Sequence, residues 1–325
     1  MASQDHIRNP IEWGWDQITL ATLTLGSLGR SLSGSEESRN APLPAVCRIK
    51  VTDLRDALVR GLDDLGAYRT DVIFLCLIYP LVGISLALLT FGYETLPLLF
   101  PLASGFALVG PVAAVGLYEM SRRREQGIPI TWADAFGGIS SPAFGAILVL
   151  GLMLVAIFLI WIAVAQAIYV ATFGYVPAAS MPDFARQVLT TREGWTLAIV
   201  GNFVGFLFAV LVLSLTVVSF PLLLDRDVGV ATAILTSVRA VLANPFTIAV
   251  WGLIVAALLV LGSIPAFIGL AVVMPVLGHA TWHLYRKLVE PDLTDRPRFN
   301  EPRPKARRYA ADFPASLFPA RHDQP

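Results

Sequence analysis

Long apolar runs are the feature that most constrains how this chain can fold. A helix rises about 1.5 Å per residue, so a run of about 20 residues crosses a hydrocarbon core of about 30 Å. The 325-residue chain is 55% hydrophobic and only 15% charged, whereas soluble domains carry about 25% charged residues. We therefore predict an all-α, polytopic membrane protein with six transmembrane helices in three hairpins. The predicted spans are Val72–Phe91, Leu98–Met120, Ala143–Val170, Thr196–Leu222, Phe246–Leu261 and Ala266–Leu284.

Lys and Arg residues near the span ends predict the orientation, because cytoplasmic loops are enriched in them. The connections on one side of the predicted membrane each carry several basic residues, whereas those on the other side carry only Arg186 and Arg192. Both termini are therefore predicted to lie in the cytoplasm. The basic residues on that side are Arg55, Arg60, Arg69, Arg122, Arg123, Arg124, Arg226, Arg239, Arg286, Lys287, Arg296, Arg298 and Arg303.

A short amphipathic segment precedes each outward-going span on the cytoplasmic side. The segments are "DLRDALVRGLDDLGAYRTD" (53–71), "TWADAFGGISSP" (131–142) and "GVATAILTSVRAVLANP" (229–245). We interpret surface helix, outward span and return span as one unit used three times. Such surface helices lie in the headgroup plane with the apolar face toward lipid, and anchoring is their expected role. In the outer loop, Ser180 and Asp183 indicate the start of a further short helix.

Composition divides the chain into three regions. Residues 1–50 contain the linker-like stretch "SLSGSEESRNAPLP" and are predicted to form a flexible cytoplasmic segment. Residues 51–290 are the predicted six-span membrane domain. Residues 291–325 are rich in Pro with Arg and Lys interleaved, a composition that cannot bury enough apolar surface to fold. We therefore predict a disordered cytoplasmic tail.

Two histidines, His279 and His283, lie in "GHATWHLYRKLVEP" at the end of the last predicted span. Residues four apart share one face of a helix, so one metal ion could bridge them. Zinc needs at least one further ligand, and no Cys or acidic residue lies near them in the sequence. The surrounding aromatic and basic residues are typical of a membrane interface. We interpret both histidines as structural, with metal binding and proton sensing as the alternatives.

Few polar residues lie inside the spans, and none of them is a mid-span charge. Gln166 and Asn202 are amides that could line a solute path or hydrogen-bond a neighbouring helix. Gly201 and Gly205 lie one turn apart and indicate close helix packing. In the predicted cytoplasmic loop, either Asp225 or Asp227 could cap the helix that follows, and Arg226 could pair with either carboxylate.

Several function classes find no support in the residues. A formal net charge of zero gives no global field for nucleic acid. Pumps and proton-coupled carriers keep ionisable groups in the membrane interior, and none is found there. Neither a phosphate-binding glycine loop, a nucleophile elbow nor a metal cluster motif is found. We therefore expect no enzyme activity and no cofactor.

The chain resembles a family of bacterial integral membrane proteins of unknown function, some members of which are labelled cytochrome c oxidase subunit I. The resemblance rests on segments between residues 50 and 291, including "DLRDALVRGLDDL", "PLASGFALVGPVAAVGLYEMSRRREQG" and "MPVLGHATWHLYRKLVEP". It implies a polytopic protein of the inner (plasma) membrane and no established activity. With four histidines in the whole chain, two of them in the tails, the oxidase label has no support.

These observations lead to one functional hypothesis and one rival. We expect a non-enzymatic inner-membrane protein, either a facilitative path for a small solute or a scaffold of an envelope assembly. Its expected partners are membrane lipids, with other membrane proteins or self-association as further candidates, and no nucleic acid. The rival is a redox or metal-dependent membrane subunit that uses His279 and His283.

Overall fold

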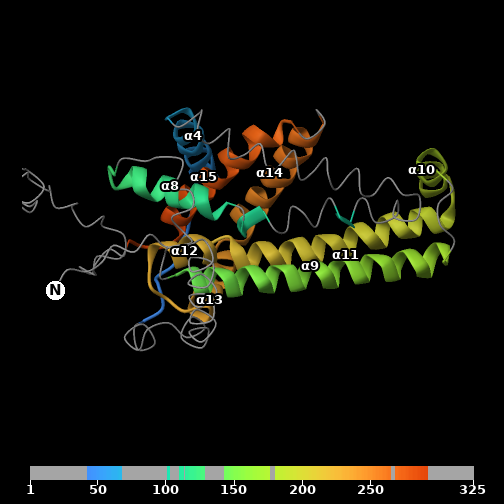
Figure 1. Cartoon of the computed structure of the whole chain (residues 1–325), viewed down its shortest axis with the longest axis horizontal. Helices are drawn as coiled ribbons and strands as arrows, with labels where there is room; N and C mark the ends of the chain where they lie inside the picture. The colour runs from blue at the N-terminus through green and yellow to red at the C-terminus, as the bar shows by residue number, and fades with distance from the viewer. Residues whose placement is uncertain are drawn as a thin grey trace, which may run out of the picture. The chain divides into compact units, whose positions relative to one another are not determined.

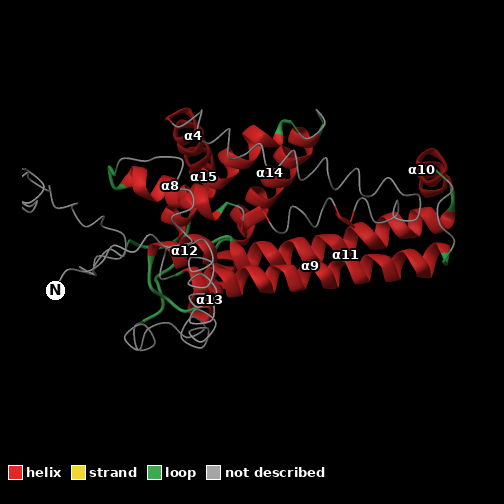
Figure 2. Cartoon of the chain, in the orientation of Figure 1, coloured by secondary structure: helices red, strands yellow, loops and turns green. Residues whose placement is uncertain are grey.

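The computed structural model describes residues 42–67, 101–102, 110–112, 114–128, 143–175, 180–264 and 268–291, all within the compact unit Met1–Asp292. Regular structure in these ranges is helical, apart from one isolated β-bridge (Figure 2). The helices, labelled in Figure 1, are α4 (Val51–Ala67), α8 (Val115–Glu125), α9 (Phe144–Phe173), α10 (Met181–Thr190), α11 (Arg192–Thr216), α12 (Ser219–Asp225), α13 (Val230–Ala243), α14 (Pro245–Ser263) and α15 (Leu270–Leu288). For these residues the prediction of an all-α fold is confirmed.

Three helical segments of the described chain are long and apolar enough to cross a membrane. They are α9, the continuous stretch Arg192–Asp225 formed by α11 and α12, and α14. These segments coincide with the third, fourth and fifth predicted spans. The first predicted span, Val72–Phe91, lies outside the described residues, and the second, Leu98–Met120, is described only in part.

Helix α15 covers most of the sixth predicted span but is not among the candidate membrane helices of the described chain. Its first half is apolar, whereas its second half contains two histidines, Arg286 and Lys287. Most of its residues are buried, and it packs against α4, α8, α12 and α14. Other helices of the protein therefore surround much of α15, where the sequence predicted contact with lipid.

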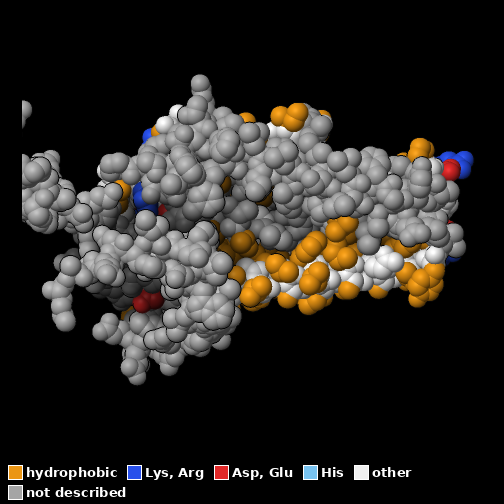
Figure 3. Space-filling model, viewed as in Figure 1, with side chains coloured by type: hydrophobic (Ala, Val, Ile, Leu, Met, Phe, Trp, Pro, Cys, Tyr) orange, Lys and Arg blue, Asp and Glu red, His pale blue; other side chains and the backbone are white. Residues whose placement is uncertain are grey.

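Helices α9 and α11 lie side by side and run in opposite directions (Figure 1). A Cβ atom added at Gly205 would lie 3.1 Å from Cη2 of Trp161, so the glycine lets the two helices approach. The Trp161 ring also packs against Phe208, with 5.4 Å between ring centroids. Figure 3 shows hydrophobic side chains along the surface of this pair. Exposed members include Leu152, Leu159, Phe203 and Phe206.

Helix α10 confirms the short helix predicted in the loop before the fourth span. The Ser180 hydroxyl accepts a hydrogen bond from the Asp183 N–H at 3.3 Å, which caps the helix N-terminus. Phe184 packs on Tyr169 and Phe173 of α9, with ring centroids 6.2 and 6.3 Å apart. Local capping and one aromatic cluster thus fix α10 to the end of α9.

Helix α4 places its apolar face on α15. Leu54, Ala57 and Leu65 are buried, and a Cβ atom at Gly61 would lie 2.7 Å from the backbone nitrogen of Ala280. The face with Leu54, Ala57 and Leu65 is therefore covered by α15 rather than by lipid, whereas Val59 and Leu62 of α4 are exposed. The segment 131–142, the second predicted surface helix, lies outside the described residues.

An extended segment, residues 44–50, precedes α4 and is called the N-terminal strap. Val46 forms an antiparallel bridge with Val289, just after α15. The Cys47 N–H donates to the Leu288 carbonyl at 2.8 Å, and the Glu290 N–H donates to the Ala45 carbonyl at 3.1 Å. The strap thus joins the beginning of the described chain to its end.

Asn244, between α13 and α14, holds the N-terminal strap from the other side. Its Oδ1 accepts from the Ile49 N–H at 2.8 Å, and its Nδ2 donates to the Cys47 carbonyl at 3.0 Å. The Thr247 hydroxyl donates to the Ile49 carbonyl at 3.2 Å. The buried amide therefore satisfies strap backbone groups that lack a full β-ladder.

We predict that Gly61→Ala destabilises the protein by about 1–3 kcal/mol, because the added methyl meets the backbone of α15, which cannot rotate away. Thermal unfolding of the detergent-solubilised protein measures the effect. Gly66→Ala on the same helix is the matched control, since a Cβ there has no neighbour within 4 Å. Equal melting temperatures for the two variants would contradict the close contact between α4 and α15.

Candidate functional site

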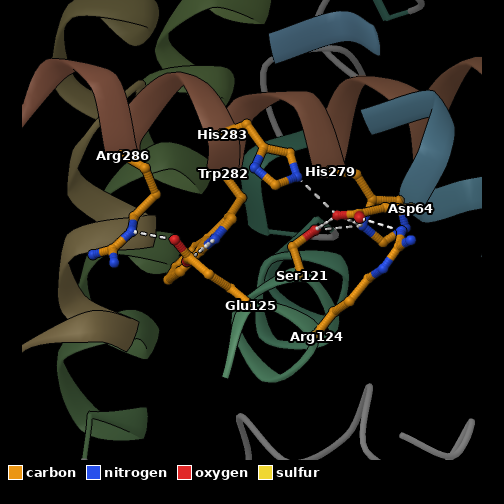
Figure 4. A network of polar contacts seen from close by, with 8 residues as sticks. All are labelled: Asp64, Ser121, Arg124, Glu125, His279, Trp282, His283 and Arg286. Atoms are coloured by element: carbon orange, nitrogen blue, oxygen red, sulfur yellow. Dashed lines mark hydrogen bonds and ion pairs between the residues drawn. The ribbon is translucent and has the colours of Figure 1, made fainter. Parts of the chain in front are cut away.

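A buried carboxylate, Asp64 of α4, joins three helices at what we call the Asp64 cluster: Asp64, Ser121, Arg124, His279 and His283 (Figure 4). Arg124 of α8 donates to Asp64 Oδ1 at 2.5 Å. Asp64 Oδ2 accepts from the Ser121 hydroxyl at 2.5 Å and lies 2.9 Å from His283 Nε2. Ser121 Oγ also lies 2.7 Å from His279 Nδ1. The polar atoms of the cluster thus bind one another, apart from His279 Nε2, which is buried without a hydrogen-bond partner among the described residues.

Helix spacing explains how each element supplies its part of the cluster. Ser121 and Arg124 are three residues apart and share a face of α8, while His279 and His283 are four apart and share a face of α15. Asp64 follows Gly61 by three residues, so it faces α15 where the two helices are in closest contact. The prediction that the two histidines share a face is therefore confirmed. That face of α15 contacts α4 and α8.

Opposing effects set the ionisation of Asp64. Burial alone would raise its pKa, because it removes water from the charged form. Hydrogen bonds from His283 and Ser121 outweigh burial, so the pKa of Asp64 lies below its ordinary value of 3.8. The carboxylate is therefore ionised at neutral pH, and the Arg124 guanidinium offsets its charge.

Glu119, on α8 next to the cluster, binds two arginines of its own helix. Its carboxylate accepts from Arg122 through both oxygens at 2.8 Å and from Arg123 at 2.8 Å. Glu119 is almost completely buried. Arg122 and Arg123, two of the basic residues from which the orientation was predicted, thus form ion pairs within the protein.

A second polar group links α8, α12 and α15. Glu125 lies 3.3 Å from Trp282 Nε1 and 3.1 Å from Arg286 Nε (Figure 4). Arg286 also donates to Asp225 at 3.3 Å, and the Tyr285 hydroxyl donates to the same carboxylate at 2.7 Å. The aromatic and basic residues assigned to a membrane interface from the sequence therefore bind acidic side chains of other helices.

Two further ion pairs lie at the end of α15. Lys287 donates to Asp53 at 3.1 Å and to Asp56 at 3.2 Å, both on α4. Partial burial would lower the pKa of Lys287, but these bonds outweigh it and the pKa is raised. The pKa of Asp53 is lowered, first by the N–H of Lys50 and then by Lys287. These charges fix the register of α4 on α15.

The loop residues Asp225, Arg226 and Asp227 do not cap α13. Gly229 is the N-cap residue of α13, and no side chain bonds there. Asp225 instead ends α12 and binds α15, as described above. Arg226 lies 3.8 Å from Asp225, in line with the expected pairing, and also donates to the Glu290 carbonyl. The segment after α12 is therefore tied to the segment after α15.

The other sequence-predicted residues are spread along α9 and α11. Gln166 and Asn202 are both exposed, and Asn202 donates to the Ala198 carbonyl of its own helix at 2.7 Å. A Cβ at Gly201 would meet no atom within 4 Å, whereas Gly205 packs on Trp161. Only Gly205 therefore makes the close helix contact that the sequence suggested for both glycines.

Metal binding by the two histidines receives no support from the geometry. The carboxylate that lies between them is bound by Arg124, whose positive charge opposes a cation at the same place. Within the described ranges, no group of three or more His, Cys, Asp or Glu residues is arranged to hold a metal ion. The arrangement is suited to holding helices together.

Sequence reasoning missed Asp64, Ser121 and Arg124. One signal was present: Asp64 lies on the apolar stripe of α4, together with Leu54 and Leu65, where an acidic residue needs a partner. The identity of that partner was not readable, because Asp64 and His283 are 219 positions apart.

Residues 99–225 match the family model described as "Predicted integral membrane protein (DUF2189)". The match includes α8, α9, α10, α11 and α12. No curated protein and no solved structure matches the chain.

We predict that Asp64→Asn destabilises the protein by about 1–3 kcal/mol, because a buried neutral amide replaces the carboxylate that accepts hydrogen bonds from Ser121 and His283, and the partly exposed Arg124 loses its ion pair. Thermal unfolding and hydrogen exchange of α4 amides measure the loss. Asp63→Asn is the matched control, since Asp63 is the exposed neighbour on the same helix. If both variants unfold alike, the cluster does not stabilise the fold.

We predict that lowering the pH weakens the packing of α4 on α8 and α15, because Asp64 becomes protonated. Because the folded-state pKa of Asp64 is depressed, its contribution is complete above the unfolded value of 3.8 and declines as pH falls through the folded pKa. Hydrogen exchange of α4 between about pH 7 and about pH 3 should show this loss in the native protein. Asp64→Asn should lack that component; an identical pH profile would contradict the assignment.

Proposed function

We propose that this chain is a non-enzymatic scaffold of the bacterial inner membrane, because residues 99–225 match a family model of predicted integral membrane proteins. Its role is to hold a polar helical block, formed by α4, α8 and α15, on membrane-spanning helices. The candidate spans α9, α11 with α12, and α14 support the membrane part of the proposal. In its full form, the proposal has six spans in three hairpins.

The observation that carries the proposal is the mutual engagement of the Asp64 cluster. A catalytic or transport site needs polar groups that are available to a substrate. Here the carboxylate binds Arg124, Ser121 and His283 at 2.5–2.9 Å, and His279 lies against Ser121. Such a network contributes rigidity and a unique arrangement of helices, which suits a scaffold.

The geometry favours a scaffold over a solute path. Path-lining amides would face an interior shared by several helices, whereas Gln166 and Asn202 are exposed. Asn202 Nδ2 is bound to its own helix. Exposed amides on apolar helices instead suit hydrogen bonds to neighbouring membrane proteins or to a second copy.

Orientation follows from the distribution of basic residues, and the proposal keeps both termini cytoplasmic. Arg226, Arg239 and Arg286 then lie on the cytoplasmic side, and Arg186 and Arg192 lie outside. The ion-paired block, formed by α4, the end of α8 and the second half of α15, is thereby a cytoplasmic feature, while the apolar first half of α15 completes the sixth span. Its exposed surfaces are available to envelope partners, while lipid covers the apolar faces of α9 and α11.

The scaffold predicts a fixed partner and no intrinsic flux. Native mass spectrometry of the full chain, extracted gently from its own membranes, should detect a complex of constant stoichiometry. Liposomes containing the purified chain should pass small neutral solutes no faster than empty liposomes. Asp64→Asn should reduce recovery of the complex, while Asp63→Asn should leave it unchanged.

Two results would overturn this proposal. Solute flux above that of empty liposomes would favour the facilitative path. Stoichiometric metal or a visible absorption band that is lost in His283→Ala would favour the redox or metal-dependent subunit. A His279→Ala variant would then show whether both imidazoles take part.

A further inference from the structure

Helix α13 exposes two leucines and Arg239, and apart from Val230 its buried residues are small or polar. Its buried positions include Ala233, Thr236, Ser237 and Ala240, and it packs against α9, α11, α12 and α14. Its large exposed side chains are Leu235 and Leu242, the latter 73% exposed. This distribution is the reverse of that expected for a helix whose outer face meets water.

A hydrogen bond from the α11–α12 break to Ser237 fixes which side of α13 faces the protein interior. The Ser237 hydroxyl accepts from the Val218 N–H at 3.2 Å, at the break between α11 and α12. Thr236 bonds to the Thr232 carbonyl of its own helix at 2.7 Å. The polar side chains therefore have partners inside the protein, so the outward direction of Leu235 and Leu242 is set by packing.

Length excludes α13 as a span of its own. Its 14 residues extend about 21 Å at about 1.5 Å per residue, less than a hydrocarbon core of about 30 Å. The helix is nevertheless apolar. An apolar helix that is too short to cross, and that exposes large side chains, suits the region between headgroups and acyl chains.

The exposed face of α13 adjoins the candidate span α14, which indicates that lipid covers it. Asn244 separates α13 from α14, and Phe246 in the first turn of α14 is 73% exposed. The surface of Leu242 thus leads within four residues to a helix that is long and apolar enough to lie in lipid. Arg239, also exposed on α13, supplies a cation of the type that binds lipid phosphate.

We infer that α13 lies in the plane of the lipid interface, with Leu235, Leu242 and Phe246 among the acyl chains and Arg239 at the level of the phosphates. The inference rests on the membrane placement of α14 in the proposed function. The sequence predicts both α4 and α13 as surface helices. Helix α4 also exposes Val59 and Leu62, but α13 differs because its exposed leucines adjoin the candidate span α14.

Nitroxide accessibility tests the inference in the full chain, with Cys47 and Cys76 replaced by serine and one chain in each lipid nanodisc. Labels are placed separately at Leu242→Cys, Arg239→Cys and Leu253→Cys. The label at 242 should collide more often with oxygen than with a water-soluble nickel chelate, and the label at 239 should show the reverse. Leu253, on α14 and 70% exposed, reports the membrane placement itself.

The outcomes separate the two proposals. A label at 253 that is open to the nickel chelate would overturn the membrane placement of α14, and with it the proposed function. A lipid-exposed 253 with a water-exposed 242 would overturn only the inference for α13. In liposomes, spin–spin broadening at 242 that disappears on dilution with unlabelled chain would show that a second copy, rather than lipid, covers this face.

Discussion

A carboxylate removed from water constrains the arrangement of the whole α4, α8 and α15 block. Transfer of an ionised group into a poorly polar interior is costly unless charge and hydrogen-bond partners come with it. Asp64 obtains a guanidinium and a hydroxyl from α8 and an imidazole from α15. A shift of α8 by a turn would remove the guanidinium and the hydroxyl from the carboxylate, and a shift of α15 would remove the imidazole. The cluster therefore selects one register of three helices, which apolar packing alone would specify less sharply.

Two amphipathic segments that look like copies in the sequence serve opposite purposes in the structure. In α4 the apolar stripe is used inside the protein, because Gly61 lets the helix reach the backbone at Ala280. In α13, Ala233, Ser237 and Ala240 are buried, whereas Leu235 and Leu242 remain exposed. The position of small residues, more than the overall amphipathicity, decides which face is buried.

Local rules predicted what local interactions determine. The apolar runs of α9, α11 and α14 and the Ser180 cap of α10 depend on neighbouring residues, and the structure contains them. The shared face of His279 and His283 also followed from helix spacing. The partners of that face did not, because Asp64 and Arg124 lie far away in sequence. Asp225 was misread for the same reason: a carboxylate before a helix suggests a cap, but a distant tyrosine and arginine bind it.

The N-terminal strap and α4 depend on the segment that the ribosome makes much later. The Val46–Val289 bridge and the Asp64–His283 bond both connect the start of the described chain to its last helix. During translation, the strap and α4 emerge before the residues of α15 and Val289 that will contact them. Insertion of the intervening apolar helices must therefore proceed while α4 is unpartnered, and release of α15 closes the fold. A chain truncated before α15 would therefore retain the candidate spans, but its N-terminal strap and α4 would lack the helix on which they pack.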